Sequence, residues 1–410
     1  MFSLPNEIYF VESYGLSLML SGEKIKPREY NERAGYGVRV LKDKKLGFSY
    51  CEKKENLEKA LESAEKTSRF SRKTGFTFAP EADYKKMNTY DRRIEYMEPG
   101  ELKSILEQVR DGAERYSKNT KIVLSTETDR VELENTEGFT GKHTDSSLSI
   151  YAEVMDDGGF GYYSNAFTHL PGDYSGMGLH AAELARKMRK PAKPVAGEYD
   201  VIMETEVLEE LIDIMIPSFL GDWKRRGISR LTDKQGKKFF DEKFSMYEDG
   251  TLETVSGRPF DEEGTPSGRI AVVEKGIVEN FAYNRETAAL EGVEKNGQCN
   301  RPGFSTPPAT GFSNLEIGTG NVESLTDEYP DAINIYSLHG THTANRTSGD
   351  FGVEVNAAFV GKDETAVGGF MLTGNIFNLF KNIKGIEKRA KKSGGFISPR
   401  IAFEKLKVVS

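Results

Sequence analysis

Residues 191–219 have the sequence PAKPVAGEYDVIMETEVLEELIDIMIPSF, and the character of the chain changes within this stretch. Two prolines three positions apart end a helix and stiffen the backbone, so we place a domain boundary near residue 195. The run Tyr199–Met203 then predicts a strand. An amphipathic helix is predicted next, because apolar residues recur there at helical spacing, namely Leu208, Leu211, Ile212, Met215 and Phe219.

The sequence before this boundary predicts an α+β domain over residues 1–193. Charged turns between short β-favouring runs indicate antiparallel hairpins, with the runs at residues 8–11, 17–20, 35–40 and 47–50. Residues 122–124 and 131–133 are interpreted as a further strand pair. Apolar residues at helical spacing predict helices around residues 57–64, 102–113 and 179–188. Strand runs followed by helices, without regular alternation, are typical of α+β folds.

The sequence after the boundary predicts a second, mainly β domain over residues 197–410. It is rich in Gly, Thr, Val and Phe and contains short β-favouring runs, at residues 270–273, 277–281, 333–338, 353–360 and 366–372. So many short strands favour a curled sheet or a barrel-like arrangement. The locally basic tail, residues 381–407, is interpreted as a solvated helix face followed by a final strand.

Composition excludes several classes of protein. The 410 residues carry a net charge of −8, which argues against nucleic acid as a partner. No apolar run approaches the roughly 20 residues that cross a bilayer, and the first residues do not resemble a signal peptide. We therefore expect a cytoplasmic protein without a membrane partner. The two cysteines, Cys51 and Cys299, are too few for a disulfide-built scaffold.

The familiar catalytic motifs are absent, but residues 338–351 form a polar, glycine-containing cluster. Neither a G-x-S-x-G nucleophile elbow nor a phosphate-binding glycine loop occurs. The cluster is interpreted either as a patch that lines a cleft or as a hairpin loop whose polar side chains bond their own backbone. Both interpretations stay open for its candidate site residues, His339, His342, Asn345 and Asp350.

A second polar cluster, residues 256–268, places three adjacent carboxylates between glycines and prolines. Glycines and prolines in this arrangement predict a defined turn. Its acids Asp261, Glu262 and Glu263 are candidates for binding a substrate amine or a partner's arginine, although they could simply face water. Cys299 is more readily explained as a buried cysteine than as a nucleophile. The neighbouring Asn300 and Arg301 are further cleft-lining candidates.

At these clusters the chain resembles the TldD/PmbA family, also called modulator of DNA gyrase or U62 peptidases. Residues 257–264, GRPFDEEG, are similar to the family's P-F-D-D-E-G, and residues 347–351, TSGDF, to its T-G-D-[YF]. Residues 35–40 are similar to G-x-G-V-R-V. Each motif is weak alone, but their common order is specific and spans residues 8 to 402. Further matching segments are residues 135–139, 269–281 and 372–375.

The resemblance also indicates a branch of the family. TldD-like chains carry H-E-x-x-x-H on a helix shortly before Gly-Asp, here Gly221-Asp222. The two histidine positions hold Ile212 and Pro217, which cannot ligate zinc, and the glutamate position holds Asp213. The resemblance therefore implies the PmbA/TldE branch. In that branch a TldD-type partner supplies the zinc of a heterodimer that acts on unstructured peptides, and this chain alone binds no metal.

Two hypotheses follow from the resemblance. In the first, the chain is the zinc-free subunit of a metallopeptidase, as a heterodimer with a TldD-type subunit or as a homodimer. In the second, it is a self-sufficient metal-dependent peptidase that uses His339, His342 and Asp350. The missing H-E-x-x-x-H favours the first, and whether the chain is itself an enzyme stays open. The interface of the heterodimer or of the homodimer should bury more than roughly 1,000 Å² in total.

Overall fold

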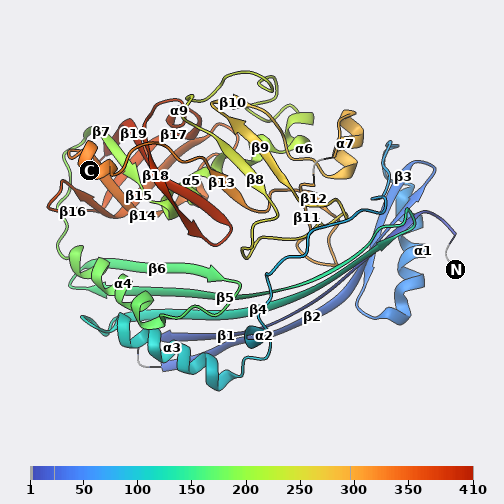
Figure 1. Ribbon diagram of the computed structural model, residues 1–410, viewed down its shortest axis with the longest axis horizontal. Coiled ribbons are helices and arrows are strands. Elements are labelled where there is room, and N and C mark those ends of the chain that lie inside the picture. The colour runs from blue at the N-terminus through green and yellow to red at the C-terminus, as the bar shows by residue number, and fades with distance from the viewer. Residues whose placement is uncertain (1–2, 23, 296, 410) are drawn as a thin grey trace.

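The computed structural model describes residues 3–22, 24–295 and 297–409. It has two large β-sheets, with helices beside each (Figure 1), and a small two-stranded one. Of the large sheets, one is an antiparallel sheet formed within residues 6–167, and the other is formed within residues 197–409. The α+β prediction is confirmed, with a mixed N-terminal half and a mostly β C-terminal half. The division into separate domains at residues 193–197 stays a prediction.

The N-terminal sheet has six strands in the order β3-β2-β1-β4-β5-β6, and every neighbouring pair is antiparallel. Alternate side chains face opposite sides of such a sheet. One side packs on helices and the other, concave side faces the C-terminal half (Figure 1). The strands are β1 (Asn6–Ser21), β2 (Lys24–Lys42), β3 (Lys45–Cys51), β4 (Thr120–Asn135), β5 (Thr140–Asp156) and β6 (Gly159–Phe167).

The prediction that residues 122–124 and 131–133 pair as two strands was wrong, because both lie in β4. The polar residues between them keep the two-residue alternation of a strand. Their side chains lie on the concave face at every second position, so polarity there does not interrupt the ladder. Similarly, residues 8–11 and 17–20 belong to one strand, β1.

The predicted N-terminal helices are present as α1 (Leu57–Ser68), α3 (Pro99–Ala113) and α4 (Tyr174–Lys187). Pro99 begins α3, which has a capping box at its start. Helices α3 and α4 approach closely because Gly112 lacks a side chain, since a Cβ there would lie 1.9 Å from the Ser175 carbonyl oxygen. The shorter elements here are η1 (Lys54–Asn56) and α2 (Arg92–Glu95).

The C-terminal half contains a closed five-stranded barrel. Its strands follow the order β19-β17-β15-β14-β7, and β19 closes the ring by also pairing with β7. The curled or barrel-like prediction is thus confirmed. The barrel strands are β7 (Gly197–Met203), β14 (Ile333–His339), β15 (Asp350–Val360), β17 (Phe370–Asn375) and β19 (Phe396–Val409).

The other strands extend the barrel sheet or lie beside it. Strands β13, β8, β9 and β10 continue the sheet from β19, while β16 pairs with β15 and β18 pairs with β19. Strands β11 and β12 form a separate pair. Their bounds are β8 (Met246–Asp249), β9 (Arg269–Glu274), β10 (Ile277–Val278), β11 (Cys299–Asn300), β12 (Ala309–Thr310), β13 (Leu315–Ile317), β16 (Thr365–Val367) and β18 (Ile383–Ser393).

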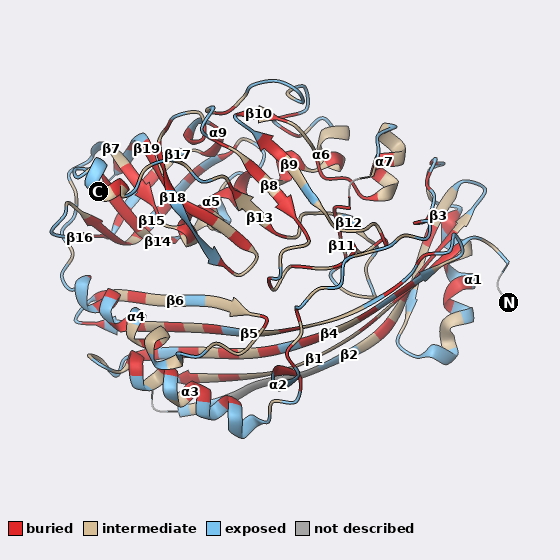
Figure 2. Ribbon diagram, in the orientation of Figure 1, coloured by how far each residue is buried: buried red, intermediate tan, exposed pale blue. Residues whose placement is uncertain are grey.

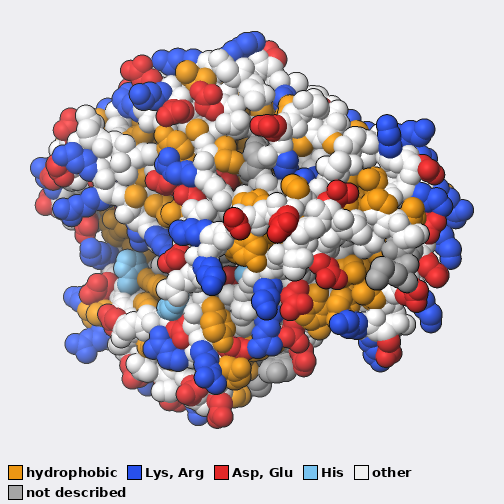
Figure 3. Space-filling view, turned by 45° about the vertical axis from the view of Figure 1, so that its right-hand side comes forward, with side chains coloured by type: hydrophobic (Ala, Val, Ile, Leu, Met, Phe, Trp, Pro, Cys, Tyr) orange, Lys and Arg blue, Asp and Glu red, His pale blue; other side chains and the backbone are white. Residues whose placement is uncertain are grey.

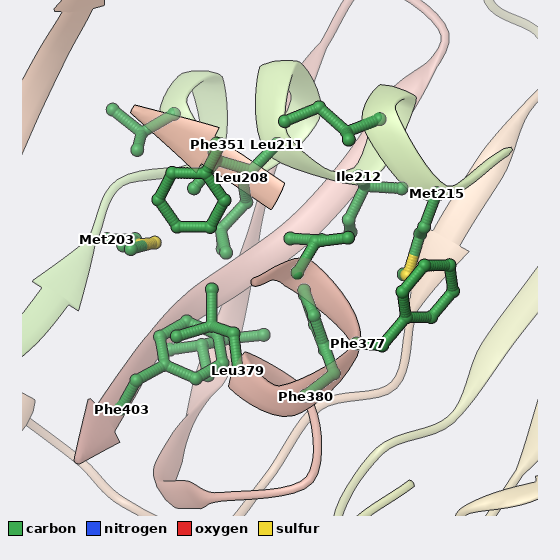
Figure 4. Packing of buried hydrophobic residues seen from close by; sticks show 14 of the residues in the cluster. Met203, Leu208, Leu211, Ile212, Met215, Phe351, Phe377, Leu379, Phe380 and Phe403 are labelled. Atoms are coloured by element: carbon green, nitrogen blue, oxygen red, sulfur yellow. The ribbon is translucent and has the colours of Figure 1, made fainter. Parts of the chain in front are cut away.

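Helix α5 (Thr205–Met215) carries the predicted apolar stripe into the largest hydrophobic core. Figure 4 shows Leu208, Ile212 and Met215 among aromatic rings of α9 and β19. This packing holds the helix firmly, because buried apolar area is its main stabilisation. The remaining helical elements are η2 (Ile216–Phe219), α6 (Gly221–Arg225), α7 (Arg285–Glu291), α8 (Leu325–Glu328), η3 (Thr341–Thr343) and α9 (Ile376–Leu379).

The helix face predicted for the basic tail was wrong, whereas the final strand predicted after it is present as β19. Residues 383–393 form β18, which pairs antiparallel with β19 in a hairpin. Ile383 and Ile386 are buried in the core, and backbone pairing with β19 outweighs the local spacing of charges. Within the residues described, no helix is long and apolar enough to cross a membrane.

The distribution of burial follows these layers. Buried residues gather along the strands and on the inner sides of the helices, while the outer helix faces are exposed (Figure 2). On the face shown in Figure 3, acidic and basic side chains are interspersed. That face therefore offers no continuous basic surface of the kind that binds nucleic acid.

Candidate functional site

A cavity of about 570 Å³ lies between the concave face of the N-terminal sheet and loops of the C-terminal half. Its floor comes from β1, β4 and β5, and its opposite wall from residues 255–258 and 301–305. The strand register brings polar residues into rows on the floor. Ser13 lies opposite Asp129, and Asp129 lies opposite Asp145. We call this space the seam cavity.

His143 and Asp145 form a hydrogen-bonded pair on the floor. Nδ1 of His143 lies 2.5 Å from Oδ2 of Asp145, and the hydroxyl of Thr89 bonds the other oxygen of this carboxylate. The imidazole is only 11% exposed, and its Nε2 has no partner among the described residues. Burial lowers the pKa of His143, but the hydrogen bond and charge of Asp145 outweigh it, so the pKa is raised. The raised pKa shifts the ring toward the imidazolium form, in which Nε2–H is a donor.

Asp129 adds a second carboxylate beside this pair. Burial raises the pKa of Asp129, and the nearby charge of Asp145 raises it further. The hydroxyl of Ser13 and the charge of His143 act in the opposite direction. An added cation stabilises the charged form of a carboxylate whose pKa is raised by burial and by a neighbouring acid.

The opposite wall gathers three residues of the predicted clusters, Glu262, Asn300 and Arg301. Nη2 of Arg258 donates to Oδ1 of Asn300 at 2.6 Å, and Arg258 lies 3.6 Å from a Glu262 oxygen. Glu262 and Arg301 line the seam cavity, while Asn300 supports the wall through a bond to the Phe312 carbonyl.

Asp261 and Glu263 lie behind this wall and are fully buried. Glu263 accepts a 2.6 Å hydrogen bond from Arg39 of β2, and Asp261 pairs with Lys295. Arg39 also donates to Glu7 of β1 at 2.8 Å. We call these five residues the ion network. Buried charges persist only when they are paired and hydrogen-bonded, so this network ties the N-terminal sheet to the C-terminal half.

Arg301 extends the ion network to the cavity wall. Its Nη2 donates to Glu7 at 2.8 Å and to the Glu262 carbonyl at 3.1 Å, and its guanidinium covers the Tyr9 ring. Burial opposes ionisation of Glu263, but the charges of Arg39 and Lys295 hold its pKa well below the usual range. Neither Asp261 nor Glu263 lines the seam cavity, so neither is placed to bind a substrate amine there.

One group of three metal-capable side chains converges within the described residues, and it consists of Asp261, Glu263 and Cys299. Lys295 already ion-pairs with both carboxylates, at 3.7 Å from Glu263. Burial raises the pKa of the Cys299 thiol far above its usual value, and the two carboxylates raise it further. A lysine charge and a protonated thiol do not fit a zinc site, which needs deprotonated ligands and room for the ion.

The family's zinc position on α5 does not fit a metal ion either. Ile212 is 1% exposed within the hydrophobic core, and Pro217 is buried in η2. Asp213 points outward and ion-pairs with Arg346. The residues at these family positions therefore supply no imidazole, and their one carboxylate, Asp213, is already paired.

The histidine loop lies against α5, with Thr341 donating to Glu210 at 2.9 Å. His339 and His342 are exposed, and no converging group of three metal ligands in the described chain includes either. Oδ1 of Asn345 accepts two backbone N–H groups within the loop, at 3.0 Å each. Hydrogen bonds from Asn375 and Ser348 lower the pKa of Asp350. This local bonding is what a structural hairpin loop requires.

Sequence reasoning missed the floor of the seam cavity. His143, Asp145 and Asp129 lie in long strands, with only ordinary alternation around them. The available signal was that polar side chains occupy every second position of β4 and β5, which leaves one sheet face polar. Nothing in the sequence says what that face meets.

Two family profiles match the chain. One is described as the PmbA/TldA metallopeptidase C-terminal domain and matches residues 196–410, and the other, PmbA/TldA metallopeptidase domain 1, matches residues 7–68. The first covers more than half of the chain. The closed barrel and the antiparallel sheet thus belong to a metallopeptidase-like class of protein. The chain is a member of the PmbA/TldD family.

Similar proteins span nearly the whole length. An uncharacterised protein of Methanocaldococcus jannaschii is 28% identical, covering 97% of this chain and 95% of its own. A protein of Methanothermobacter thermautotrophicus named metalloprotease is 24% identical, covering 93% and 87%. Among solved structures, TldE from Thermococcus kodakarensis has a TM-score of 0.87 at 20% identity, covering 99% of this chain and 97% of that one. At that identity the likeness shows the fold.

Proposed function

We propose that this chain is the PmbA/TldE-like subunit of a cytoplasmic metallopeptidase complex that processes unstructured peptides. A TldD-type partner would supply the zinc and the water-activating glutamate. The supporting observation is the segment from helix α5 into η2, where the two family zinc positions hold the buried Ile212 and Pro217. Family membership supports the metallopeptidase class, and the seam cavity offers a space of the size that ligands occupy.

The role proposed for this chain is to bind and orient peptide. The seam cavity is bounded by sheet on one side and loops on the other, so an extended chain could lie along it. A subunit of this kind raises the rate by holding the substrate in a productive geometry. Its contribution should therefore appear in substrate affinity as well as in turnover.

Metal content and peptidase activity test this proposal directly. The purified chain, prepared without chelator, should contain far less than one zinc per chain and should not cleave an unfolded peptide. The mixture with a TldD-type subunit should contain zinc and should cleave the peptide. Near one zinc per chain, lost with activity in the His339→Ala variant, would instead show a self-sufficient peptidase.

Assembly provides the second test. Light scattering of the mixture should show a heterodimer, and scattering of the chain alone should show whether it also forms a homodimer. A stable interface of this kind buries more than roughly 1,000 Å² in total. Monomers both alone and in the mixture would contradict the subunit role.

A further inference from the structure

Unpartnered polar atoms are concentrated around the seam cavity. The described residues include ten buried side-chain nitrogen and oxygen atoms without a hydrogen-bond partner, and five belong to residues that line this cavity. Leaving such a group unsatisfied costs about 1–3 kcal/mol. Their gathering at one cavity therefore points to a polar ligand. The atoms are His143 Nε2, Arg258 Nε, Glu262 Oε2, Arg301 Nε and Arg301 Nη1.

These atoms match the polar groups of a peptide backbone. The arginine nitrogens are donors and suit carbonyl oxygens, as does His143 Nε2 in the imidazolium form, while the Glu262 oxygen is an acceptor and suits an amide N–H. The Arg301 side chain is fully buried, and His143 and Glu262 are 11% and 12% exposed. The charges of Arg258 and Arg301 are already balanced by Glu262 and Glu7. This part of the cavity is thus suited to neutral polar groups.

The floor beside them carries two carboxylates that form no ion pair among the described residues. Both Asp145 oxygens are used by Thr89 and His143. Asp129, directly opposite Asp145, has no ion-pair partner within 4 Å in the described chain, and neither does Glu127, which lies two positions along β4. Arg33 of β2 lines the same cavity, and its charge opposes the rise in the pKa of Glu127 that burial and Asp129 cause. Arg33 forms no ion pair with either carboxylate among the described residues, so an added cation would be attracted by both.

We propose that the seam cavity binds a peptide through its primary ammonium group, which Asp129 and Glu127 hold while His143 receives a backbone carbonyl. The inference rests on the proposed peptide-processing function, but the site lies wholly within this chain. Asp129 opposes Asp145, and His143 is two residues further along β5. Two strand residues span roughly 7 Å, so the acceptor for the ammonium and the donor for the carbonyl are separated by about two peptide residues. The ammonium is either the amino terminus or a lysine side chain.

Calorimetry with the purified chain alone tests this inference. Three alanine pentapeptides with amidated carboxyl ends serve as probes: one with a free amino terminus, one N-acetylated, and one N-acetylated with a central lysine. We expect at least tenfold weaker binding of the acetylated alanine peptide than of the free one. Recovery of affinity by the lysine peptide would identify a side-chain ammonium, and its absence would identify the amino terminus.

Variants then locate the site. Asp129→Asn should weaken binding of the free-amine peptide at least tenfold, and the preference for it over the acetylated peptide should be lost. His143→Gln should weaken both peptides alike, because its proposed contact is with the backbone. Glu132→Gln is the matched control, since Glu132 is an exposed carboxylate on the opposite face of the same strand, and it should bind like the unaltered chain. Circular dichroism and thermal unfolding confirm that each variant is folded.

Three outcomes overturn the inference: equal affinity for the free and acetylated alanine peptides, no binding by the chain alone, or equal losses in Asp129→Asn and Glu132→Gln. The result is distinguishable from a failure of the proposed function. That failure would appear as no cleavage in the mixture with a TldD-type subunit, even though the chain alone still selects the free-amine peptide.

Discussion

Glu263 shows how the position of a charged residue decides its role. In sequence it is one of three adjacent acids in a glycine- and proline-bounded turn, yet it is fully buried and bonded to Arg39 from the other half of the chain. Glu262, its neighbour, faces the seam cavity instead. Adjacent acids thus divide between holding the halves together and lining the space between them.

Removing the Glu263 charge should destabilise the protein strongly. In Glu263→Gln, Arg39 loses one of its two carboxylate partners while remaining buried, and Lys295 is left with Asp261. Breaking a buried ion pair costs about 3–5 kcal/mol. Urea unfolding should show a lower midpoint, and the free energy of unfolding should fall by that amount. Glu65→Gln, which breaks the exposed Lys42–Glu65 pair, is the control and should leave the midpoint unchanged. Equal effects in the two variants would contradict the structural role.

Two histidines should titrate on opposite sides of the ordinary value of about 6.5. Burial lowers the pKa of His143, but Asp145 raises it more, so we expect a midpoint above that value. Burial and then the charge of Lys391 lower the pKa of His180, so its midpoint should lie below. Proton NMR titration measures both, with His143→Gln and His180→Gln to assign the signals. A His143 midpoint at or below 6.5 would contradict the pairing with Asp145.

The sign of the stability effect follows from these directions. Because folding raises the pKa of His143, its contribution to stability is fully present below the unfolded value and is lost as the pH rises through the folded one. For His180 the folded pKa is lowered, so its protonation destabilises the fold as the pH falls. The His143→Gln variant should therefore lose the stabilising contribution only on the acidic side of this range.

At the scale of elements, helix α5 is held mainly by its apolar face, beside polar contacts such as Thr341 with Glu210. Ile212 is 1% exposed in the core, whereas Asp213, the next residue, is exposed. An amphipathic pattern predicts that the apolar residues of a helix face the core and the polar ones face solvent. The same pattern places the first family zinc position, Ile212, on the inner side.

Truncation of Ile212 should therefore cost far more than loss of the adjacent charge. We expect Ile212→Ala to lower the free energy of unfolding by about 2–5 kcal/mol, because it removes buried methyl groups and leaves a cavity. Asp213→Asn breaks only the exposed pair with Arg346 and should change little. Chemical denaturation of both variants provides the comparison. A small effect of Ile212→Ala would mean that α5 is not seated in the core as described.

Strands depend on partners more than helices do. The helical spacing in residues 205–215 was sufficient to predict α5, because the pattern repeats within one segment. Strand β4, by contrast, continues through six polar residues because β1 and β5 pair with it on both sides. Hydrogen bonds from neighbouring strands therefore decided where the strands of this sheet end.

At the scale of the whole molecule, the connection between the halves is exposed while their contact is buried. Residues 195–198 are exposed, and Val195 is 78% exposed. The ion network, in contrast, has almost no exposed surface. A chain cut at the connection should therefore remain assembled.

Limited proteolysis should cleave first within residues 193–198, where the backbone is open to a protease. Mass spectrometry identifies the fragments, and gel filtration should show that they elute together without denaturant. In Glu263→Gln, the cleaved halves should separate more readily, because part of the contact between them is lost. Early cleavage elsewhere, or halves that separate at once in the unaltered protein, would contradict this arrangement.

The sequence by itself determined the α+β class, the helices with a repeated apolar face, and the absence of imidazoles at the family zinc positions, Ile212 and Pro217. Each of these depends on residue type and local spacing, which a single segment contains. Only the tertiary structure decided that strands β4 and β5 present Asp129, His143 and Asp145 to loops more than 100 residues away, and that Asp261 and Glu263 are buried. The physical reason is that strand register and the packing of the two halves create these neighbours, and both arise from contacts between distant segments.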